Sequence, residues 1–165
     1  MMQEMNLVPF TSAALPWVEP WFDDAETRRW LGGRQWPAMV LQLADAPADE
    51  HRGRPILARQ GWLAEQAGLP VALLDVEVYA DGTASCAFVV APERRGHGVG
   101  RRALAKLADE LAAGGVREIT AGVEPANTSS VHCLLGAGFQ PQVDTPDAEG
   151  FLYFARLTGE PPKNE

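Results

Sequence analysis

A glycine-rich stretch between an apolar run and a helical pattern constrains this chain more than any other part of its sequence. The stretch runs from Val90 to Arg101, and Gly96, Gly98 and Gly100 fall within five of its residues. The residues before it are apolar, and those after it repeat apolar side chains at the spacing of one helix face. A strand, a glycine turn and a helix in this order leave backbone N–H groups free at the helix start, where the helix dipole is positive. The stretch therefore predicts a cradle for an anion, best suited to a phosphate.

The spacing of these glycines excludes two common phosphate loops. A Walker A loop ends in Gly-Lys followed by Ser or Thr, whereas Gly100 precedes Arg101, and the dinucleotide fingerprint G-x-G-x-x-G is not met either. Residues 95–100 instead resemble the Arg/Gln-x-x-Gly-x-Gly/Ala loop of the GNAT family of N-acetyltransferases, and they fit that pattern at every specified position.

Hydrophobic periodicity along the rest of the chain predicts one α/β domain over residues 1–165, in which helices flank a mixed, mostly antiparallel central sheet. The predicted strands are residues 5–10, 60–66, 71–79, 84–90, 116–123 and 151–157, with a further extended segment from Phe139. The predicted helices run from a cap at Asp23 or Asp24 to Leu31, and over residues 35–44, 98–113 and 127–137. The remaining segments are a turn at 67–70, a hairpin turn at 80–83, a polar loop and candidate lid at 45–55, and a frayed tail at 158–165.

A second motif agrees with the first. Asn127-x-x-Ser130-Val131, leading to Gly138-Phe139, is similar to the asparagine-containing helix of the GNAT family and to its Gly-Phe ending. The order of the predicted elements also resembles that of the family over nearly the whole chain. The resemblance implies the acyl-CoA N-acyltransferase fold and transfer of an acetyl group from acetyl-CoA to an amine. It leaves the amine open, because one fold serves many functions.

The charge and composition of the chain limit the kinds of molecule it can bind and the compartment in which it is expected. The net charge of −8 disfavours nucleic acid, because a phosphate backbone would be repelled overall, and the four arginines between residues 94 and 102 form a local positive site on an acidic body. No apolar run approaches the roughly 18 residues that span a bilayer, and the first six residues lack the pattern of a signal peptide. Cys86 and Cys133 lie in apolar surroundings without C-x-x-C spacing, which predicts buried thiols in a reducing compartment. The sequence therefore predicts a cytoplasmic protein.

The resemblance implies which residues hold acetyl-CoA. The loop would bind the pyrophosphate, and the pantetheine arm would pair with the backbone of Phe88 and Val90, because the family separates that strand from the one at 116–123. A backbone N–H near Val89 or Val90 would donate to the thioester oxygen as negative charge develops there, a contact whose loss typically costs about 3–4 kcal/mol. The expected cofactor-binding residues are Phe88, Val89, Val90, Arg95, Gly96, His97, Gly98, Val99, Gly100, Arg101, Asn127 and Ser130.

The reaction also needs a group that accepts a proton from the amine. An alkylamine has a pKa near 10, so only about one-thousandth of it is neutral at pH 7. A carboxylate, acting through water, can accept the proton. Glu77 and Asp75 share one face of their predicted strand, and Glu124 follows the strand at 116–123, so these three are the candidate bases. Relatives often carry a carboxylate six residues before the loop proline, but Cys86 occupies that position here.

A proton donor for the leaving thiolate is harder to find. Many relatives place a tyrosine seven residues after the helix asparagine, and Leu134 stands there in this chain. Ser130, one turn earlier, is the alternative, through a water molecule, although helix packing is its simpler role. A thiol has a pKa near 8.5, so its thiolate can leave unprotonated, and positioning alone can supply the catalysis. His97 is expected in solvent and His132 in a structural role; neither has a partner at metal-ligand spacing, so no metal site is predicted.

The acceptor side is the least determined part of the sequence. Trp17, Trp21, Trp30 and Trp36 lie within twenty positions and predict either core packing or an aromatic wall for the acceptor. Residues 26–33 are loosely similar to N-terminal helices of aminoglycoside-type acetyltransferases. The function predicted first is acetylation of the primary amine of a small molecule by direct attack. The alternatives are a protein or peptide amine as acceptor, and a coenzyme A-binding module without turnover. A homodimer is expected only because dimers are frequent among relatives.

Overall fold

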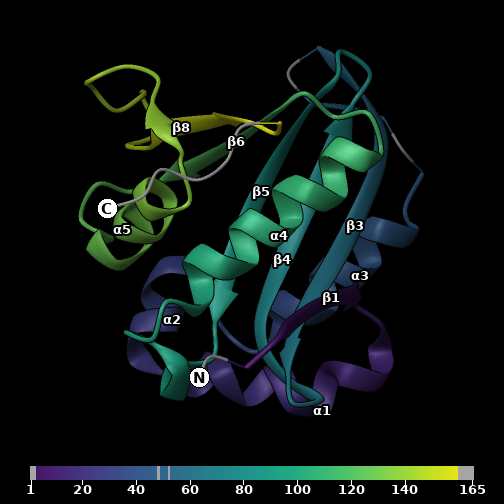
Figure 1. Cartoon of the computed structure of the whole chain (residues 1–165), viewed down its shortest axis with the longest axis vertical. Coiled ribbons are helices and arrows are strands. Elements are labelled where there is room, and N and C mark those ends of the chain that lie inside the picture. The colour runs from purple at the N-terminus through teal and green to yellow at the C-terminus, as the bar shows by residue number, and fades with distance from the viewer. Residues whose placement is uncertain (1–2, 48, 52, 160–165) are drawn as a thin grey trace.

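One eight-stranded sheet, covered by helices on both faces, organises the described part of the chain (Figure 1). The structure is a computed structural model that describes residues 3–47, 49–51 and 53–159. Its strands are β1 (Met5–Pro9), β2 (Glu50–His51), β3 (Arg54–Gln66), β4 (Leu69–Tyr79), β5 (Thr83–Val90), β6 (Glu118–Val123), β7 (Gln140–Pro141) and β8 (Leu152–Leu157). Its α-helices are α1 (Leu15–Val18), α2 (Ala25–Leu31), α3 (Gln35–Asp45), α4 (Val99–Ala113) and α5 (Thr128–Gly136), with short 3₁₀ turns η1 (Ser12–Ala14), η2 (Glu19–Asp23) and η3 (Pro92–Arg94).

The strand order is β1-β3-β4-β5-β6-β8-β7, with β2 paired to β3 beside this path. Every pairing is antiparallel except that of β5 with β6, where α4 makes the crossover that a parallel pair requires. The predicted mixed, mostly antiparallel sheet is therefore confirmed. Figure 1 shows β6 and β8 diverging from β5, so that the sheet divides into two arms with α5 beside the shorter one.

Alternating side chains of the central strands build a core on each face of the sheet. Leu74 and Val76 of β4 belong to the core that α4 covers, where Leu104 and Leu107 are fully buried. Each of these leucines contributes about 2 kcal/mol by leaving water. Leu73, on the opposite face, packs in the core of the N-terminal helices. The sheet is thus buried on both sides along residues 71–74, which explains the continuous apolar run in the first half of β4.

The strand predicted at 60–66 begins earlier, at Arg54, as β3. Three further sequence predictions need correction. The polar stretch at 45–55 is not one loop, because Glu50 and His51 pair with the start of β3 as β2; residues 48 and 52 lie outside the described residues. The turn predicted at 67–70 is confined to Ala67 and Gly68, whose φ angles of +52° and +76° suit a two-residue hairpin turn. Thr158 is not part of a frayed tail, because its Oγ1 donates to the Val116 carbonyl at 2.7 Å; residues 160–165 lie outside the described residues.

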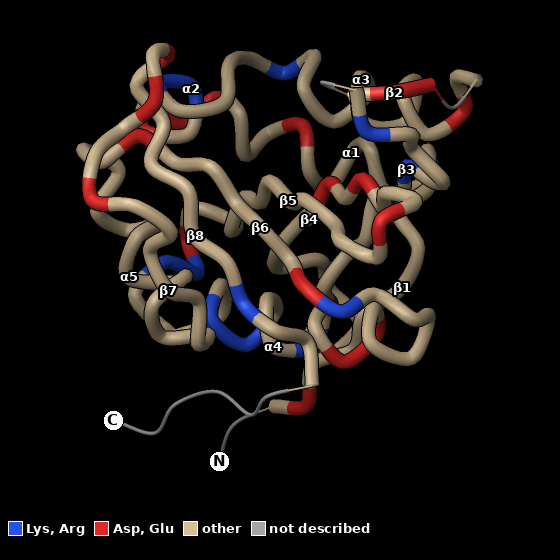
Figure 2. Tube along the Cα trace, turned by 90° about the horizontal axis from the view of Figure 1, so that it is seen from above, with Lys and Arg blue, Asp and Glu red and all other residues tan. Residues whose placement is uncertain are grey.

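Charge is spread over the molecule rather than gathered in one block. Figure 2 shows acidic positions on many parts of the trace, interspersed with Lys and Arg. Among the described residues, none of the helices has the length and apolar character needed to cross a membrane. Cys86 is buried and Cys133 is half-buried, and both are free thiols, so the expectation of full burial holds only for Cys86.

Candidate active site

The edge of β5 that faces β6 is open over half its length. Pairing between the two strands covers only three residue pairs, after which β5 stays paired with β4 alone. The Ala91 N–H donates to the Val71 carbonyl of β4 at 2.9 Å. Backbone groups alternate in direction along a strand, so those of Cys86, Phe88 and Val90 point toward the β6 side. The expected separation of the two strands is confirmed, and it leaves a row of donors and acceptors for a ligand.

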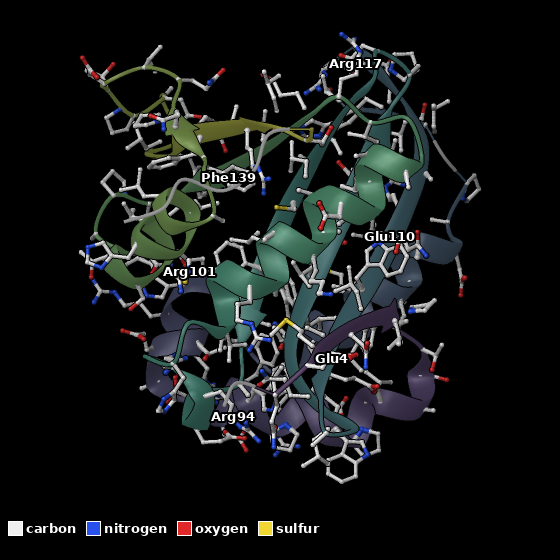
Figure 3. All side chains as sticks on the ribbon, viewed as in Figure 1. Glu4, Arg94, Arg101, Glu110, Arg117 and Phe139 are labelled. Atoms are coloured by element: carbon white, nitrogen blue, oxygen red, sulfur yellow. The ribbon has the colours of Figure 1, made fainter. Side chains whose placement is uncertain are left out.

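The glycine-rich loop leads into the start of α4. Gly98 is the N-cap with a φ of +76°, and no side chain of the described residues caps the helix there. Gly96 has a φ of +80° and open space beside its Cα. The first N–H groups of α4 thus face a cavity of about 660 Å³ that the loop and α5 line. Arg94 and Arg101 also line it, and Figure 3 shows Arg101 on the side of α4 toward α5. These features have the geometry that an anion cradle requires.

The loop residues contribute to the cradle in different ways, although Val99 and Gly100 both line its cavity. Val99 is only 3% exposed and belongs to the core beneath α4. His97 points into solvent, as expected. His132, expected in a structural role, is exposed on α5 and lines the cavity of the loop. Gly100 is buried where the helix start contacts β5 and α5.

The packing of Gly100 gives a stability prediction. Gly100→Ala is expected to lower the free energy of unfolding by about 1–3 kcal/mol, because a Cβ would lie 2.6 Å from Cys133 Sγ and 3.2 Å from Val90 Cγ2. Urea unfolding followed by circular dichroism measures the loss. Adding Cys133→Ala removes the nearer clash and should restore part of the stability. Gly100→Ala with unchanged stability would contradict this packing role.

Two arginines near the loop turn away from it. The Arg95 guanidinium lies at the start of α2, where it forms an ion pair with Asp24 at 2.9 Å and donates to Thr27 Oγ1 at 2.5 Å. Arg102 donates to the Gln3 carbonyl at 2.6 Å. The guanidinium of Arg95, expected at the pyrophosphate, is therefore paired with residues of α2, while Arg95 also lines the cavity of the loop.

A second cavity, of about 320 Å³, lies along the open edge of β5. The predicted residues that line it are Phe88, Val89, Val90, Arg95, Glu124, Asn127 and Ser130. Asn127 caps α5, because its Oδ1 accepts from the Ser130 N–H at 3.3 Å, which gives both residues a structural role as well. Glu124 is exposed at the rim, and Leu134 is fully buried in the wall.

A third cavity, of about 390 Å³, holds the strand carboxylates. Asp75, Glu77 and Tyr79 line it from one face of β4, as period-two alternation predicts. This cavity and the one along β5 share four lining residues, so they are contiguous: Cys86, Ala87, Gly122 and Phe151. Asp75 is directly opposite Ala87 in the β4–β5 register, so its carboxylate lies one strand away from the open edge.

The two strand carboxylates have different surroundings. Both oxygens of Glu77 are engaged, one with Arg59 at 2.9 Å and the other with the Tyr79 hydroxyl, which donates to it at 2.9 Å. Burial raises the pKa of Asp75 from 3.8 to about 6, and the neighbouring charge of Glu77 adds to the effect. Burial also raises the pKa of Cys86 to about 12, so its thiol stays protonated and does not replace the missing carboxylate. Asp75 is therefore better placed to accept a proton than Glu77.

Sequence reasoning missed two partners of Glu77, which are Tyr79 and Arg59, and the serine that contacts Tyr79. Tyr79 continues the face of Asp75 and Glu77, so alternation alone was a signal for it. Ser85, which lies 3.0 Å from the Tyr79 hydroxyl, is opposite Glu77 once the hairpin register is known. No local pattern predicts the contact of Arg59, because Arg59 lies on β3 and is brought opposite Glu77 only by the pairing of β3 with β4.

The tryptophans divide between the two roles expected for them. Trp21 and Trp36 are buried, and Trp36 stacks on Phe22 with ring centroids 5.6 Å apart. Trp30 and Trp36 also line the cavity along β5, so Trp36 belongs both to the core and to a cavity wall. Trp17 is 58% exposed and serves neither.

Known proteins share this sequence and fold. The sequence profile of the Acetyltransferase (GNAT) family matches residues 16–139. The chain is 31% identical over 139 residues to a Bacillus subtilis (strain 168) protein described as uncharacterized N-acetyltransferase YfmK, covering 82% of this chain and 84% of that one.

Solved structures with the same fold include two bound to coenzyme A or a derivative. The aminoglycoside acetyltransferase AAC(6')-Ib in complex with coenzyme A is 18% identical with a TM-score of 0.72, over 93% of this chain and 95% of that one. Mycobacterium smegmatis RimJ in complex with CoA-disulfide is 21% identical with a TM-score of 0.73, over 93% of this chain and 81% of that one. Together with the family match, the loop and the open edge of β5 lead to one conclusion: the chain belongs to the GNAT acetyltransferase family, as an N-acetyltransferase with acetyl-CoA as its donor.

Proposed function

We propose that this protein acetylates the primary amine of a small cationic molecule, by direct attack of the amine on acetyl-CoA. The observation that carries the proposal is the position of Asp75. This half-buried carboxylate lines a cavity contiguous with the open edge of β5, and its raised pKa makes it a base that works near neutral pH.

The described residues fit acetyl-CoA, which would supply the activated acetyl group. The N–H groups at the start of α4, with Arg94 and Arg101 beside them, suit the pyrophosphate. The free backbone groups of Phe88 and Val90 suit the amides of the pantetheine arm. These three features follow one another along a continuous line of cavities, since Val90 lines both the cavity of the loop and the one along β5.

The direction of the backbone selects the hydrogen-bond donor for the acetyl oxygen. Val89 is two residues before Ala91, whose N–H donates to β4, so the Val89 N–H also points to β4 and is used in the sheet. The N–H of Val90 points the other way, toward the open edge of β5, where no strand pairs with it in the described residues. We therefore assign to Val90 the role that the sequence left open between the two residues.

Proton transfer from the amine falls to Asp75. A group with a pKa of about 6 is ionised at neutral pH, so it can accept a proton directly or through one water molecule. Glu77 is paired with Arg59, which balances its charge, so the attraction for the cationic amine comes mainly from Asp75. Glu124 has only a rim position, and its role as a base is the weaker proposal.

No tyrosine is needed for the leaving thiolate in this proposal. Leu134 is buried in the cavity wall, and Ser130 beside it lines the same cavity. A thiolate with a pKa near 8.5 leaves at modest cost, and Ser130 would at most orient a water molecule.

The shape and charge of the site favour a small acceptor. The cavity holding Asp75 and Glu77 encloses about 390 Å³ and offers hydroxyls of Tyr79 and Ser85 beside the two carboxylates. This combination suits a cationic amine with hydroxyl groups, as in an aminoglycoside. A related fold has been solved as AAC(6')-Ib with paromomycin and acetyl-CoA, at 18% identity. A peptide or protein amine is the alternative acceptor.

The proposal is tested in two steps. Acetyl-CoA at about 100 times its Kd should raise the Tm by about 5–10 °C, because ligand that binds only the folded state stabilises it by about 2.7 kcal/mol. Release of free thiol is then measured with kanamycin, spermidine, lysine, a peptide with a free N-terminus and an acetyl-capped lysine peptide. Release with a small amine supports the proposal. Release with a peptide alone favours the alternative acceptor, and a Tm shift without release from any amine favours a binding module.

A further inference from the structure

The Arg95 side chain joins the donor loop to the helix on the acceptor side. Its guanidinium contacts three side chains of the first turn of α2: Asp24 at 2.9 Å, Thr27 at 2.5 Å and Glu26 at 3.5 Å. Its backbone belongs to the glycine-rich loop, 68 residues away from Thr27 in the sequence. The contacts of Arg95 therefore form a direct polar link between the glycine-rich loop and α2.

The partners of Arg95 are themselves fixed. Asp24 is the N-cap of α2, and its Oδ2 accepts from the Thr27 N–H at 3.0 Å. Thr27 is only 3% exposed. The Arg95 hydrogen bond is the largest influence that holds the pKa of Asp24 below its ordinary value, so the pair stays ionised through neutral pH. Charge-assisted hydrogen bonds of this kind are roughly twice as strong as neutral ones.

Helix α2 forms one wall of the cavity along β5. Glu26, Thr27, Trp30 and Leu31 line that cavity, and so does Arg95. The helix is only seven residues long, from Ala25 to Leu31, so it depends on tertiary contacts for its stability. A loss of the Arg95 contacts would therefore loosen the wall.

We propose that Arg95 is a positioning residue for the acceptor side, which holds α2 against the donor loop, and not a ligand of the pyrophosphate. The loop then binds the donor through backbone N–H groups and through Arg94 and Arg101, while the Arg95 guanidinium keeps Trp30 and Leu31 in the cavity wall. That this wall serves the acceptor rests on the proposed function. That Arg95 pairs with α2 and not with the pyrophosphate is a separate claim, which holds whatever the acceptor is.

The test compares the wild type with Arg95→Ala, Arg95→Lys and Asp24→Asn. Asp24→Asn keeps a side-chain oxygen for the helix cap and removes only the charge that faces Arg95. Two quantities are measured: the Kd of coenzyme A by calorimetry, and hydrogen exchange of the backbone amides of residues 26–31. The amides of residues 103–111 in α4 serve as an internal reference for global stability.

Arg95→Ala and Asp24→Asn should both raise exchange in residues 26–31 by about 10-fold or more, because each removes a charge-assisted contact, with α4 unchanged. Arg95→Ala should leave the coenzyme A Kd within about 3-fold of the wild type, and Arg95→Lys should restore part of the protection. With the best amine of the thiol-release panel, Arg95→Ala should raise the KM of the amine by about 10-fold and that of acetyl-CoA little.

Two results would overturn the inference. One is a coenzyme A Kd raised about 10-fold or more by Arg95→Ala with exchange of α2 unchanged, which identifies a phosphate ligand. The other is increased exchange in α2 and α4 alike, which identifies a general loss of stability. If no amine releases thiol from the wild type, the proposed function fails on its own, and exchange together with the coenzyme A Kd still decides the role of Arg95.

Discussion

Asp75→Asn is expected to stabilise the protein and to impair it as an enzyme. The pKa of Asp75 is 3.8 in the unfolded chain and about 6 in the folded protein, so the folded state binds this proton more tightly than the unfolded state. Stability from this group is complete below pH 3.8, falls as pH rises toward 6, and stays lower above it. The shift corresponds to about 3 kcal/mol. An uncharged side chain of the same size avoids this cost, so Asp75→Asn should raise the Tm at pH 8 and make little difference at pH 3.

The activity of the same variant should fall by about 10²- to 10⁴-fold in kcat/KM, since a general base contributes on that scale. The wild-type pH profile should show a limb near pH 6 that the variant lacks, besides the limb of the amine near pH 10. Glu77→Gln is the matched control. It breaks the ion pair with Arg59 and should destabilise the fold. It should keep the acidic limb but move it below pH 6, because the charge of Glu77 helps to raise the pKa of Asp75. An unchanged rate and profile in Asp75→Asn would place the base elsewhere, with Glu124 as the next candidate.

Gly98→Glu should weaken acetyl-CoA binding by about 100-fold or more, because it places a negative charge at the anion cradle. Gly98 has a φ of +76°, which a side chain adopts at a cost, and the nearest described atom to its Cβ would be a guanidinium nitrogen of Arg101 at 3.7 Å. The fold should therefore survive with a loss of about 1–2 kcal/mol. Calorimetric titration with acetyl-CoA measures the Kd, and thermal unfolding measures the stability.

Gly98→Ala separates charge from backbone strain in that experiment. It carries the same cost of the left-handed conformation without the carboxylate, so it should lose similar stability and much less affinity. Equal Kd values for Gly98→Glu and the wild type would show that the pyrophosphate does not bind at the start of α4. Equal losses of affinity in the two variants would attribute the effect to the shape of the loop.

Local sequence patterns were sufficient for most of the fold. The alternation over residues 74–79, the Asp81-Gly82 turn and the glycine-bounded helix at 98–113 predicted β4, β5 and α4, because each pattern is set by contacts within a few residues. The short β2 strand was missed because it has no such local pattern. Two residues in a polar, proline-containing stretch have no periodicity, and their pairing with β3 is decided by a register that no local pattern contains.

The sequence by itself determined the donor side of this protein: a glycine-rich loop at a helix start, at the end of an apolar strand, is a local arrangement of backbone that residues 90–101 specify alone. The tertiary structure decided the rest of the site. Asp75 and Glu77 are equivalent in the pattern, but β3 brings Arg59 to Glu77 and the surrounding strands bury Asp75. Arg95 belongs to the loop in the sequence, yet the fold brings α2 to its guanidinium. Desolvation and ion pairing depend on groups far apart in the chain, so which carboxylate takes the proton and which arginine meets the donor follow only from the packed structure.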